Sequence, residues 1–234
     1  MRAGRTRVAA TAMLSAVCVL HAASAAAASS AVAAPDLKVG DRWVYHAVDG
    51  YRTKMVWDET HEVTAIGPDG ITVTVTTKGL ARDTTRTEIW SAPGVVRSGA
   101  IYESETDRFD PPLIRYQYPM SVGTSWSQRV RNLDKPPDPY GPISYRATVR
   151  GQEKVTTPAG TFDALRISYV IQLDDESLAQ YPTQCEYTFW YAASVGAAVR
   201  EQRRSYSTQK GGGTSPRVPG QNAQFTLTSF TRGR

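Results

Sequence analysis

The sequence has little cysteine, and its apolar segments are short. Cys18 and Cys185 are the only cysteines, and Cys18 lies in the amino-terminal segment. If that segment is removed, one thiol remains and no intramolecular disulfide can form, so a hydrophobic core must stabilise the fold. The longest apolar run, residues 8–20, has 13 residues. It is shorter than the roughly 20 residues that a helix needs to cross a bilayer.

The amino terminus has the pattern of a secretory signal. Arg2, Arg5 and Arg7 precede the apolar run, and an Ala/Ser stretch ends in the small-x-small sequence of residues 31–33. This order predicts a cleaved signal peptide over residues 1–33. No Arg-Arg pair occurs before the apolar run, which favours export of an unfolded chain, so we expect no cofactor.

The remaining residues, 34–234, are then predicted to form a single secreted, extracytoplasmic domain without a transmembrane segment. Acylation of Cys18 is the alternative, but residues 15–17, Ser-Ala-Val, are a poor approach to an acylated cysteine. We therefore expect a secreted protein that is a monomer.

The charge distribution argues against a nucleic-acid partner and leaves an anionic envelope partner open. After residue 33 the chain has 24 Lys and Arg against 22 Asp and Glu, and residues 200–234 contain seven basic residues and one acid. This basic end is interpreted either as a contact for anionic cell wall or phospholipid, or as a solvated tail and strand face. Nucleic-acid binding is not expected, because Arg203-Arg204 is the only basic pair and no recognised motif accompanies it.

Apolar and polar residues alternate with a period of two along most of the chain, which is typical of half-buried antiparallel strands. The faces that show it best are Ile71–Val75, Ile143–Val149, Leu165–Ile171 and Phe225–Ser229. The pattern predicts an all-β fold, an antiparallel sheet curved into a half-barrel or barrel, with at most one short helix at 174–181. Residues 207–222 lack this alternation and are predicted to form a mobile loop.

Two short sequence patterns each occur twice. "LKVGDRW" at residues 37–43 returns as "MSVGTSW" at residues 120–126, and "EIWSAPGVVR" at 88–97 returns as "TFWYAASVGAAVR" at 188–200. We expect two related halves, about 34–117 and 118–234, because landmarks recur in the same order. The shared landmark residues are Gly40, Trp43, Trp90, Gly123, Trp126, Trp190 and Gly196.

These landmarks have a structural interpretation. A glycine at Gly40 or Gly123 allows a sharp turn at the start of a strand, and it places Trp43 or Trp126 on that strand. Each ring would then fill one half of the core. Stacking of an exposed Trp on sugar or lipid is the alternative.

Four segments together resemble the TapB-type family of bacterial secreted and lipid-anchored envelope proteins, a domain of unknown function. They are "LKVGDRWVY", "YPMSVGTSW", "VTTPAGTFDALRI" and "VGAAVRE". The most specific motif is "TPAGTF", in which Pro158 and Gly160 form the hairpin turn and Phe162 returns to the core. The resemblance implies an antiparallel sheet, curved as in lipoprotein carriers, and it supplies no catalytic residues.

Candidate chemistry is sparse. The sequence "DETHE" at residues 58–62 is the only cluster of carboxylates and histidine. On a strand, Asp58 and Glu62 share one face while Glu59 and His61 share the other, so these residues are not expected to form a metal site. We expect them to form a charged, solvated strand face. Cys185 is expected to be a buried, inert thiol, and no serine-hydrolase, zinc-protease or phosphate-binding motif occurs.

Two classes of function remain. One is a non-catalytic secreted module that presents a curved sheet to a hydrophobic ligand such as a lipid, a cell-wall polymer or a protein partner. The other is a secreted hydrolase whose residues come from distant positions, with His46, His61 and the acids as candidates. An apolar cavity would favour carriage, whereas a histidine beside two carboxylates in a cleft would favour catalysis.

Overall fold

The computed structural model describes residues 31–52, 55–79, 83–102, 105–136, 141–211 and 215–234. Most of the predicted signal peptide, with Cys18, lies outside these residues. In the described part of the chain, no helix is long and apolar enough to span a membrane.

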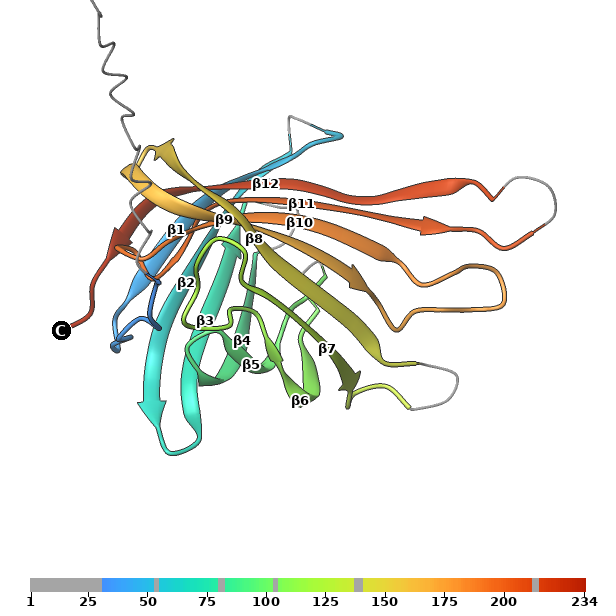
Figure 1. Ribbon diagram of the computed structural model, residues 1–234, viewed down its shortest axis with the longest axis horizontal. Helices are drawn as coiled ribbons and strands as arrows, with labels where there is room; N and C mark the ends of the chain where they lie inside the picture. The colour runs from blue at the N-terminus through green and yellow to red at the C-terminus, as the bar shows by residue number, and fades with distance from the viewer. Residues whose placement is uncertain (1–30, 53–54, 80–82, 103–104, 137–140, 212–214) are drawn as a thin grey trace, which may run out of the picture.

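Twelve antiparallel strands form one closed barrel (Figure 1). Each strand pairs with its neighbours in sequence, and the last strand pairs with the first, so the predicted all-β, barrel-like fold is confirmed. The strands are β1 (Arg42–Asp49), β2 (Val56–Gly67), β3 (Gly70–Lys78), β4 (Thr84–Ala92), β5 (Val95–Gly99), β6 (Asp107–Ile114), β7 (Ser125–Asn132), β8 (Ile143–Thr157), β9 (Gly160–Gln172), β10 (Gln184–Ala192), β11 (Ala197–Thr208) and β12 (Arg217–Thr231).

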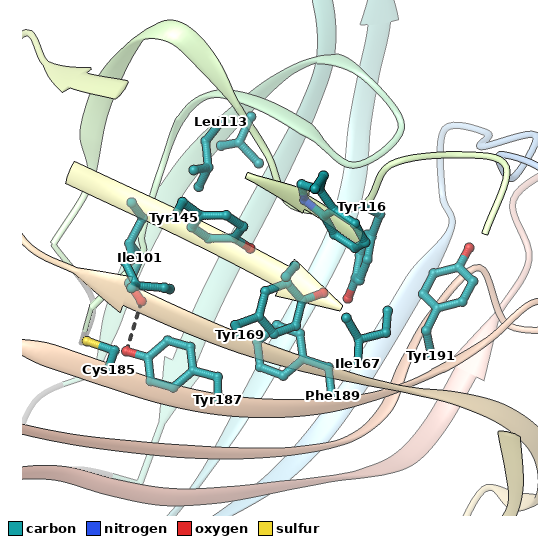
Figure 2. Packing of buried hydrophobic residues seen from close by; sticks show 14 of the residues in the cluster. Ile101, Leu113, Tyr116, Tyr145, Ile167, Tyr169, Cys185, Tyr187, Phe189 and Tyr191 are labelled. Carbon is teal, nitrogen blue, oxygen red and sulfur yellow. Dashed lines mark hydrogen bonds between the residues drawn. The ribbon is translucent and has the colours of Figure 1, made fainter. Parts of the chain in front are cut away.

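The apolar faces predicted from alternation point into the barrel. Residues 71, 73 and 75 of β3 are buried, as are residues 143, 145, 147 and 149 of β8. On β9 and β10, Tyr169, Tyr187 and Phe189 project into the same interior space (Figure 2). The interior of the barrel is therefore the hydrophobic core.

The segment 174–181, where the sequence allowed at most one short helix, is not a helix. Ser177 Oγ accepts hydrogen bonds from the backbone amides of Ala179 and Gln180, both at 3.2 Å. Asp175 accepts hydrogen bonds from the backbone and the hydroxyl of Thr183. These side chains offer the backbone an alternative to helical bonding, and the segment forms the loop between β9 and β10.

The expected loop at 207–222 is shorter than the sequence indicated. β11 continues to Thr208, and β12 begins at Arg217, which pairs with Thr208. The Arg217 guanidinium lies 4.4 Å from the ring centroid of Tyr206, so side-chain packing accompanies the backbone pairing. Polar and Gly/Pro-rich composition concealed these strand ends.

The two repeated phrases adopt the same turn. Gly40 has φ = 90° and Gly123 has φ = 93°, in the region that favours glycine. Asp41 accepts a hydrogen bond from the amide of Lys38 at 2.9 Å, and Thr124 Oγ1 accepts one from the amide of Ser121 at 3.0 Å. Duplication of the whole chain stays a prediction, and these matching turns agree with it.

β6 and β7 share a narrow backbone contact. Pro111 and Pro112 of β6 have no amide hydrogen to donate to a ladder. Side chains bridge the seam instead: Trp126 Nε1 donates to the carbonyl of Ile114 at 2.9 Å, and Gln128 Oε1 accepts from the Ile114 amide at 3.2 Å. The register pairs of this seam in the described part of the chain are Phe109 with Asn132 and Asp110 with Arg131.

The segment before β1 also packs onto the barrel. Val32 and Met120 form an antiparallel bridge with backbone hydrogen bonds of 2.7 and 2.8 Å. Val32 also packs against the buried core. Cleavage after Ala33 would remove this bridge, whereas Pro35 and Leu37 would stay with the domain.

Candidate functional site

A cavity lies inside the barrel. Its volume is about 70 Å³, measured as the space open to the centres of water-sized molecules. It is about half the size of an engineered cavity of roughly 150 Å³ that binds benzene in another protein. Aromatic, aliphatic and charged side chains from most of the strands line it. The histidine, arginine and glutamate residues of the lining are His61, Arg86, Glu88, Arg115, Glu201 and Arg203.

One group of charges comes from β2 and β4. Glu59 Oε1 lies 2.6 Å from His61 Nε2, and the guanidinium of Arg86 donates to both Glu59 oxygens at 3.4 and 3.5 Å. Arg86 Nε lies 3.9 Å from Glu88 Oε1 and has no hydrogen-bond partner among the described residues. These residues alternate along their strands, so every second side chain faces inward.

Glu88 is the most deeply buried of these charges, with 1% of its side chain exposed. Its Oε2 accepts hydrogen bonds from Trp90 Nε1 at 2.9 Å and from the Arg115 guanidinium at 3.3 and 3.4 Å. The same guanidinium lies 5.7 Å from the centroid of the Trp90 ring. Glu88 therefore has a charged and a neutral partner, as a buried carboxylate requires.

Glu201 and Arg203 form a separate pair on β11. Oε2 of Glu201 accepts from Arg203 Nε at 2.8 Å and from Nη2 at 2.5 Å. The Arg203 guanidinium also lies 4.4 Å from the centroid of Phe225. This planar group is thus held on one side by a carboxylate and on another by an aromatic face.

These partners keep the carboxylates charged. Burial by itself would raise the pKa of Glu59, but the hydrogen bond and charge of His61 and the charge of Arg86 outweigh it and hold the pKa well below its ordinary value. Burial likewise opposes the Arg115 charge at Glu88, and the pKa of Glu88 is lowered. Both glutamates are therefore ionised at neutral pH.

Tyrosine hydroxyls add polar groups to the cavity wall. Tyr45 donates to the carbonyl of Ala198 at 2.9 Å, and Tyr187 donates to the carbonyl of Ile101 at 3.2 Å (Figure 2). The hydroxyls of Tyr116 and Tyr145 have no hydrogen-bond partner among the described residues. Burial raises the pKa of both, so both phenols stay protonated.

The tryptophans singled out from the sequence are buried or half-buried, and each ring N–H has a partner. Trp43 Nε1 donates to the carbonyl of Val195 at 3.0 Å, and Trp190 Nε1 donates to Glu153. Trp43 and Trp90 line the cavity, whereas Trp126 belongs to the core beside β6.

The other signature residues lie at the tight turns. Pro158 is exposed between β8 and β9, and Gly160 follows it with φ = 136°. Phe162 is half-buried and packs against the core. Gly196, with φ = 74°, lies between β10 and β11 and lines the cavity.

The side chains of the "DETHE" sequence point alternately to the two faces of β2, as predicted. One of these faces was expected to be solvated but is buried. Asp58 is exposed and pairs with the exposed His46 at 2.9 Å. Glu59 is buried, with 5% of the residue exposed, and His61 lines the cavity. The expectation of a solvated face is wrong for Glu59 and His61, because Arg86 and the Glu59–His61 contact compensate for burial.

Cys185 is fully buried, and burial raises the pKa of its thiol to about 12. The expected inert thiol therefore fits its position on β10. No group of three metal-ligating side chains occurs among the residues that the structure describes.

Sequence reasoning missed the arginine and glutamate pairs. The sequence did contain a signal. Counting back from Trp90 along β4 in steps of two residues reaches Glu88 and Arg86, which therefore share its inward face. On β11, counting forward from the buried Val199 in steps of two residues reaches Glu201 and Arg203. Alternation alone does not predict charge at such inward positions, since ionised side chains are rarely buried unless paired.

The DUF3108-like family model matches residues 144–210, which run from β8 to the loop after β11 and include Tyr145, Glu201 and Arg203. No curated protein matches the chain.

Two crystal structures resemble the barrel. A "putative exported protein with YmcC-like fold" from Bacteroides fragilis NCTC 9343 has a TM-score of 0.50 and 13% identity, covering 86% of this chain and 100% of that chain. A "putative lipoprotein" from Parabacteroides distasonis ATCC 8503 has a TM-score of 0.48 and 12% identity, covering 86% and 99%. The chain thus shares its fold with the Bacteroides fragilis protein, and its segment 144–210 is similar to the DUF3108-like family.

Proposed function

We propose that this chain is a non-catalytic, exported binding protein that takes a small ligand into the cavity of its barrel. The observation that carries the proposal is the cavity wall, where Tyr116 and Tyr145 present hydroxyls that have no partner among the described residues. Both tyrosines line the cavity, where their hydroxyls can hydrogen-bond to water or to a ligand. Concave sites with aromatic walls and a few polar groups are typical of ligand pockets.

Export is supported by the amino-terminal pattern and by the names of the two fold neighbours, which describe an exported protein and a lipoprotein. The TapB-type resemblance belongs to the same proposal, because its most specific motif, at 157–162, falls within the DUF3108-like match. Sequencing the amino terminus of protein from culture supernatant tests export, with a start near residue 34 expected.

The charged interior argues for a compact ligand. A long acyl chain would need a continuous apolar wall, but Glu88, Arg115, Glu201 and Arg203 interrupt it. Any curved sheet offers an outer face to a cell-wall polymer or a protein partner, whereas the cavity is a specific feature of this barrel.

The alternative, a secreted hydrolase, is supported by the contact between His61 and Glu59 beside the cavity. It is weakened by the lining, whose described residues include no Ser, Thr, Cys or Lys side chain. Against the effect of burial, Glu59 is held ionised by His61 and Arg86, and Glu88 by Arg115, so neither carboxylate is suited to act as a general acid.

Native mass spectrometry of the secreted protein tests the binding function. We expect a co-purified small molecule that is absent from Ala197→Phe, because Ala197 lines the cavity and a larger side chain would fill it. Ala65→Phe, on the exposed face of β2, is the matched control and should retain the ligand. A ligand retained equally by both variants would place binding outside the barrel.

A further inference from the structure

We infer that the outer surface of strands β7–β11 binds an acidic polysaccharide. This inference goes beyond the proposed cavity binding and does not depend on it. The five strands are neighbours in the barrel, and their outward side chains include a group of arginines that we call the arginine face (Figure 1). Its members are Arg129, Arg146, Arg150, Arg166, Arg200 and Arg204.

The arginine face has an excess of positive charge. None of its six arginines forms an ion pair with a described residue, and all but the half-buried Arg200 are exposed. The acids of this surface that are not ion-paired are Glu153, which accepts from a tryptophan, and Glu186, which accepts from a glutamine and a tyrosine. The neighbouring Lys154 and Asp163 cancel as a pair at 2.9 Å. Six arginines against two glutamates leave a net charge of +4.

Most of these arginines flank a row of hydroxyl and amide side chains. The row consists of register partners on four adjacent strands, Thr148, Ser168, Thr188 and Gln202. Arg146 and Arg204 lie two residues from the row on one side, and Arg150, Arg166 and Arg200 lie two residues from it on the other. The row extends roughly 14 Å across the strands. Its four side chains are half-buried and have no hydrogen-bond partner among the described residues.

The unpaired charges oppose folding when nothing is bound. Arg166 pairs in register with Gly151, the residue after Arg150, so these two arginines are neighbours on adjacent strands. Like charges in such positions repel each other and destabilise a sheet. By contrast, Arg42 on β1 has Glu62 as a cross-strand partner at 3.8 Å. A bound polyanion would offset the repulsion on the arginine face, so its charge favours an anionic partner.

The polar row favours a polysaccharide among anionic partners. Sugar hydroxyls donate and accept hydrogen bonds, as the hydroxyl and amide groups of the row do. A linear chain can follow the convex outer surface across the strands, whereas a planar membrane meets only its crest. Membrane docking also needs several exposed apolar side chains, and Val170 is the exposed large apolar residue beside this row. Trp190 is 8% exposed, and the Arg200 guanidinium lies over its ring at 5.8 Å.

Isothermal titration calorimetry on the full secreted chain tests the partner class. Polygalacturonate is the probe, and its fully methyl-esterified form is the control, because it has the same sugar backbone without the charge. We expect polygalacturonate to bind at about 0.05 M salt and to be released toward about 0.5 M, since salt screens exposed charges. The esterified polymer and phosphatidylglycerol vesicles should not bind detectably. Polyphosphate serves as a polyanion without hydroxyls.

Charge removal tests the arginine face. The triple variant Arg146→Gln, Arg150→Gln and Arg166→Gln should weaken polygalacturonate binding about tenfold or more. The control removes the same net charge elsewhere, through substitution to Gln of the exposed residues Arg42, Lys78 and Arg97. It should bind nearly as the wild type does. The urea midpoint of the first variant should not fall, because none of its three arginines has an ion-pair partner among the described residues.

Hydroxyl removal tests the polar row. Thr148→Val combined with Ser168→Ala should weaken polygalacturonate binding about threefold, because sugar hydroxyls lose partners, and should leave the affinity for polyphosphate unchanged. The control is Thr76→Val combined with Thr85→Val, a cross-strand pair on β3 and β4. It should leave the affinity for both polymers unchanged.

The outcomes separate this inference from cavity binding. Equal losses in the two triple variants would show a response to net charge alone and would overturn the arginine face. Polygalacturonate binding that is unaffected by loss of the row hydroxyls, binding to vesicles, or no binding at low salt would overturn the polysaccharide. Ala197→Phe should leave polymer binding unchanged while it removes a cavity ligand, so either proposal can fail without the other.

Discussion

The backbone amide of Gly40 donates to the carbonyl of Val63 at 2.8 Å, and the amide of Gly123 donates to the carbonyl of Val149 at 2.9 Å. Each valine lies on the strand that follows the turn's own strand, β2 in one case and β8 in the other. The register of the sheet shifts directly after both valines. One turn thus fixes the start of a strand and its pairing at two distant places in the barrel.

The Trp that follows each turn should be a main contributor to stability. We expect Trp126→Ala to lower the free energy of unfolding by about 3–5 kcal/mol, because Trp126 is 7% exposed and packs in the core. Trp126→Phe keeps most of the burial and loses the hydrogen bond to Ile114, so about 1 kcal/mol is expected. Urea unfolding measures both. Equal, small losses would show that the ring is not a core element.

Acid should destabilise the protein through its buried glutamates. The pKa of Glu59 is lowered in the folded state, so its ionised form contributes stability that is fully present above the unfolded value of about 4.3. That stability is lost as pH falls through the folded pKa. Glu59→Gln should therefore flatten the dependence of the urea midpoint on pH below about 4.3.

The control for this prediction is Glu62→Gln, whose side chain is 45% exposed on the same strand. It should keep the wild-type pH dependence. An unchanged slope in Glu59→Gln would mean that Glu59 is not held ionised by its neighbours.

Cys185 should resist thiol reagents while the protein is folded. Its pKa of about 12 lies well above the ordinary value of 9.0, so the thiolate fraction falls about a thousandfold, and the side chain is fully buried. Labelling by iodoacetamide should be slow in buffer and rapid in denaturant. Rapid labelling of the folded protein would place the thiol at the surface.

The strands of this fold could be predicted because their apolar faces alternate with a strict period. Residues 143–149 and 165–171 show it, and the apolar face of each segment is buried as expected. Closure of the barrel was not predictable, because pairing of β12 with β1 joins residues nearly 190 positions apart, such as Arg42 and Thr231. Alternation specifies which face is buried and says nothing about the partner strand.

The site was harder to predict than the fold. Local sequence marks Glu201 and Arg203 as neighbours two positions apart, which fits an exposed pair as well as a buried one. What distinguishes the two cases is the density of charge brought in from β2, β4 and the segment after β6, and that depends on tertiary structure. Tyr116 and Tyr145 are likewise indistinguishable from ordinary core tyrosines until the cavity is seen.

The Glu201–Arg203 pair should be costly to break on one side. Arg203→Met leaves the Glu201 carboxylate buried without its counter-charge, and a loss of about 3–5 kcal/mol is expected. Adding Glu201→Gln should recover most of that loss, which a double-mutant cycle in urea measures. Arg204→Met, on the exposed face of β11, is the matched control. Additive losses in the double variant would contradict a direct coupling.

The last strand should be required to close the barrel even when the chain before it is cut. β12 pairs with β11 on one side and β1 on the other, and Phe225 and Leu227 are buried. A protease site inserted after Gly211, in the Gly/Pro-rich connection between β11 and β12, should therefore be cleaved without loss of the β signal in circular dichroism. The carboxyl-terminal fragment should co-elute with the rest on gel filtration and separate only in denaturant. Truncation before β12 instead leaves the edges of β1 and β11 unpaired, and aggregation is expected. Release of the fragment in native buffer, with the β signal intact, would show that eleven strands suffice and that β12 adds little to the core.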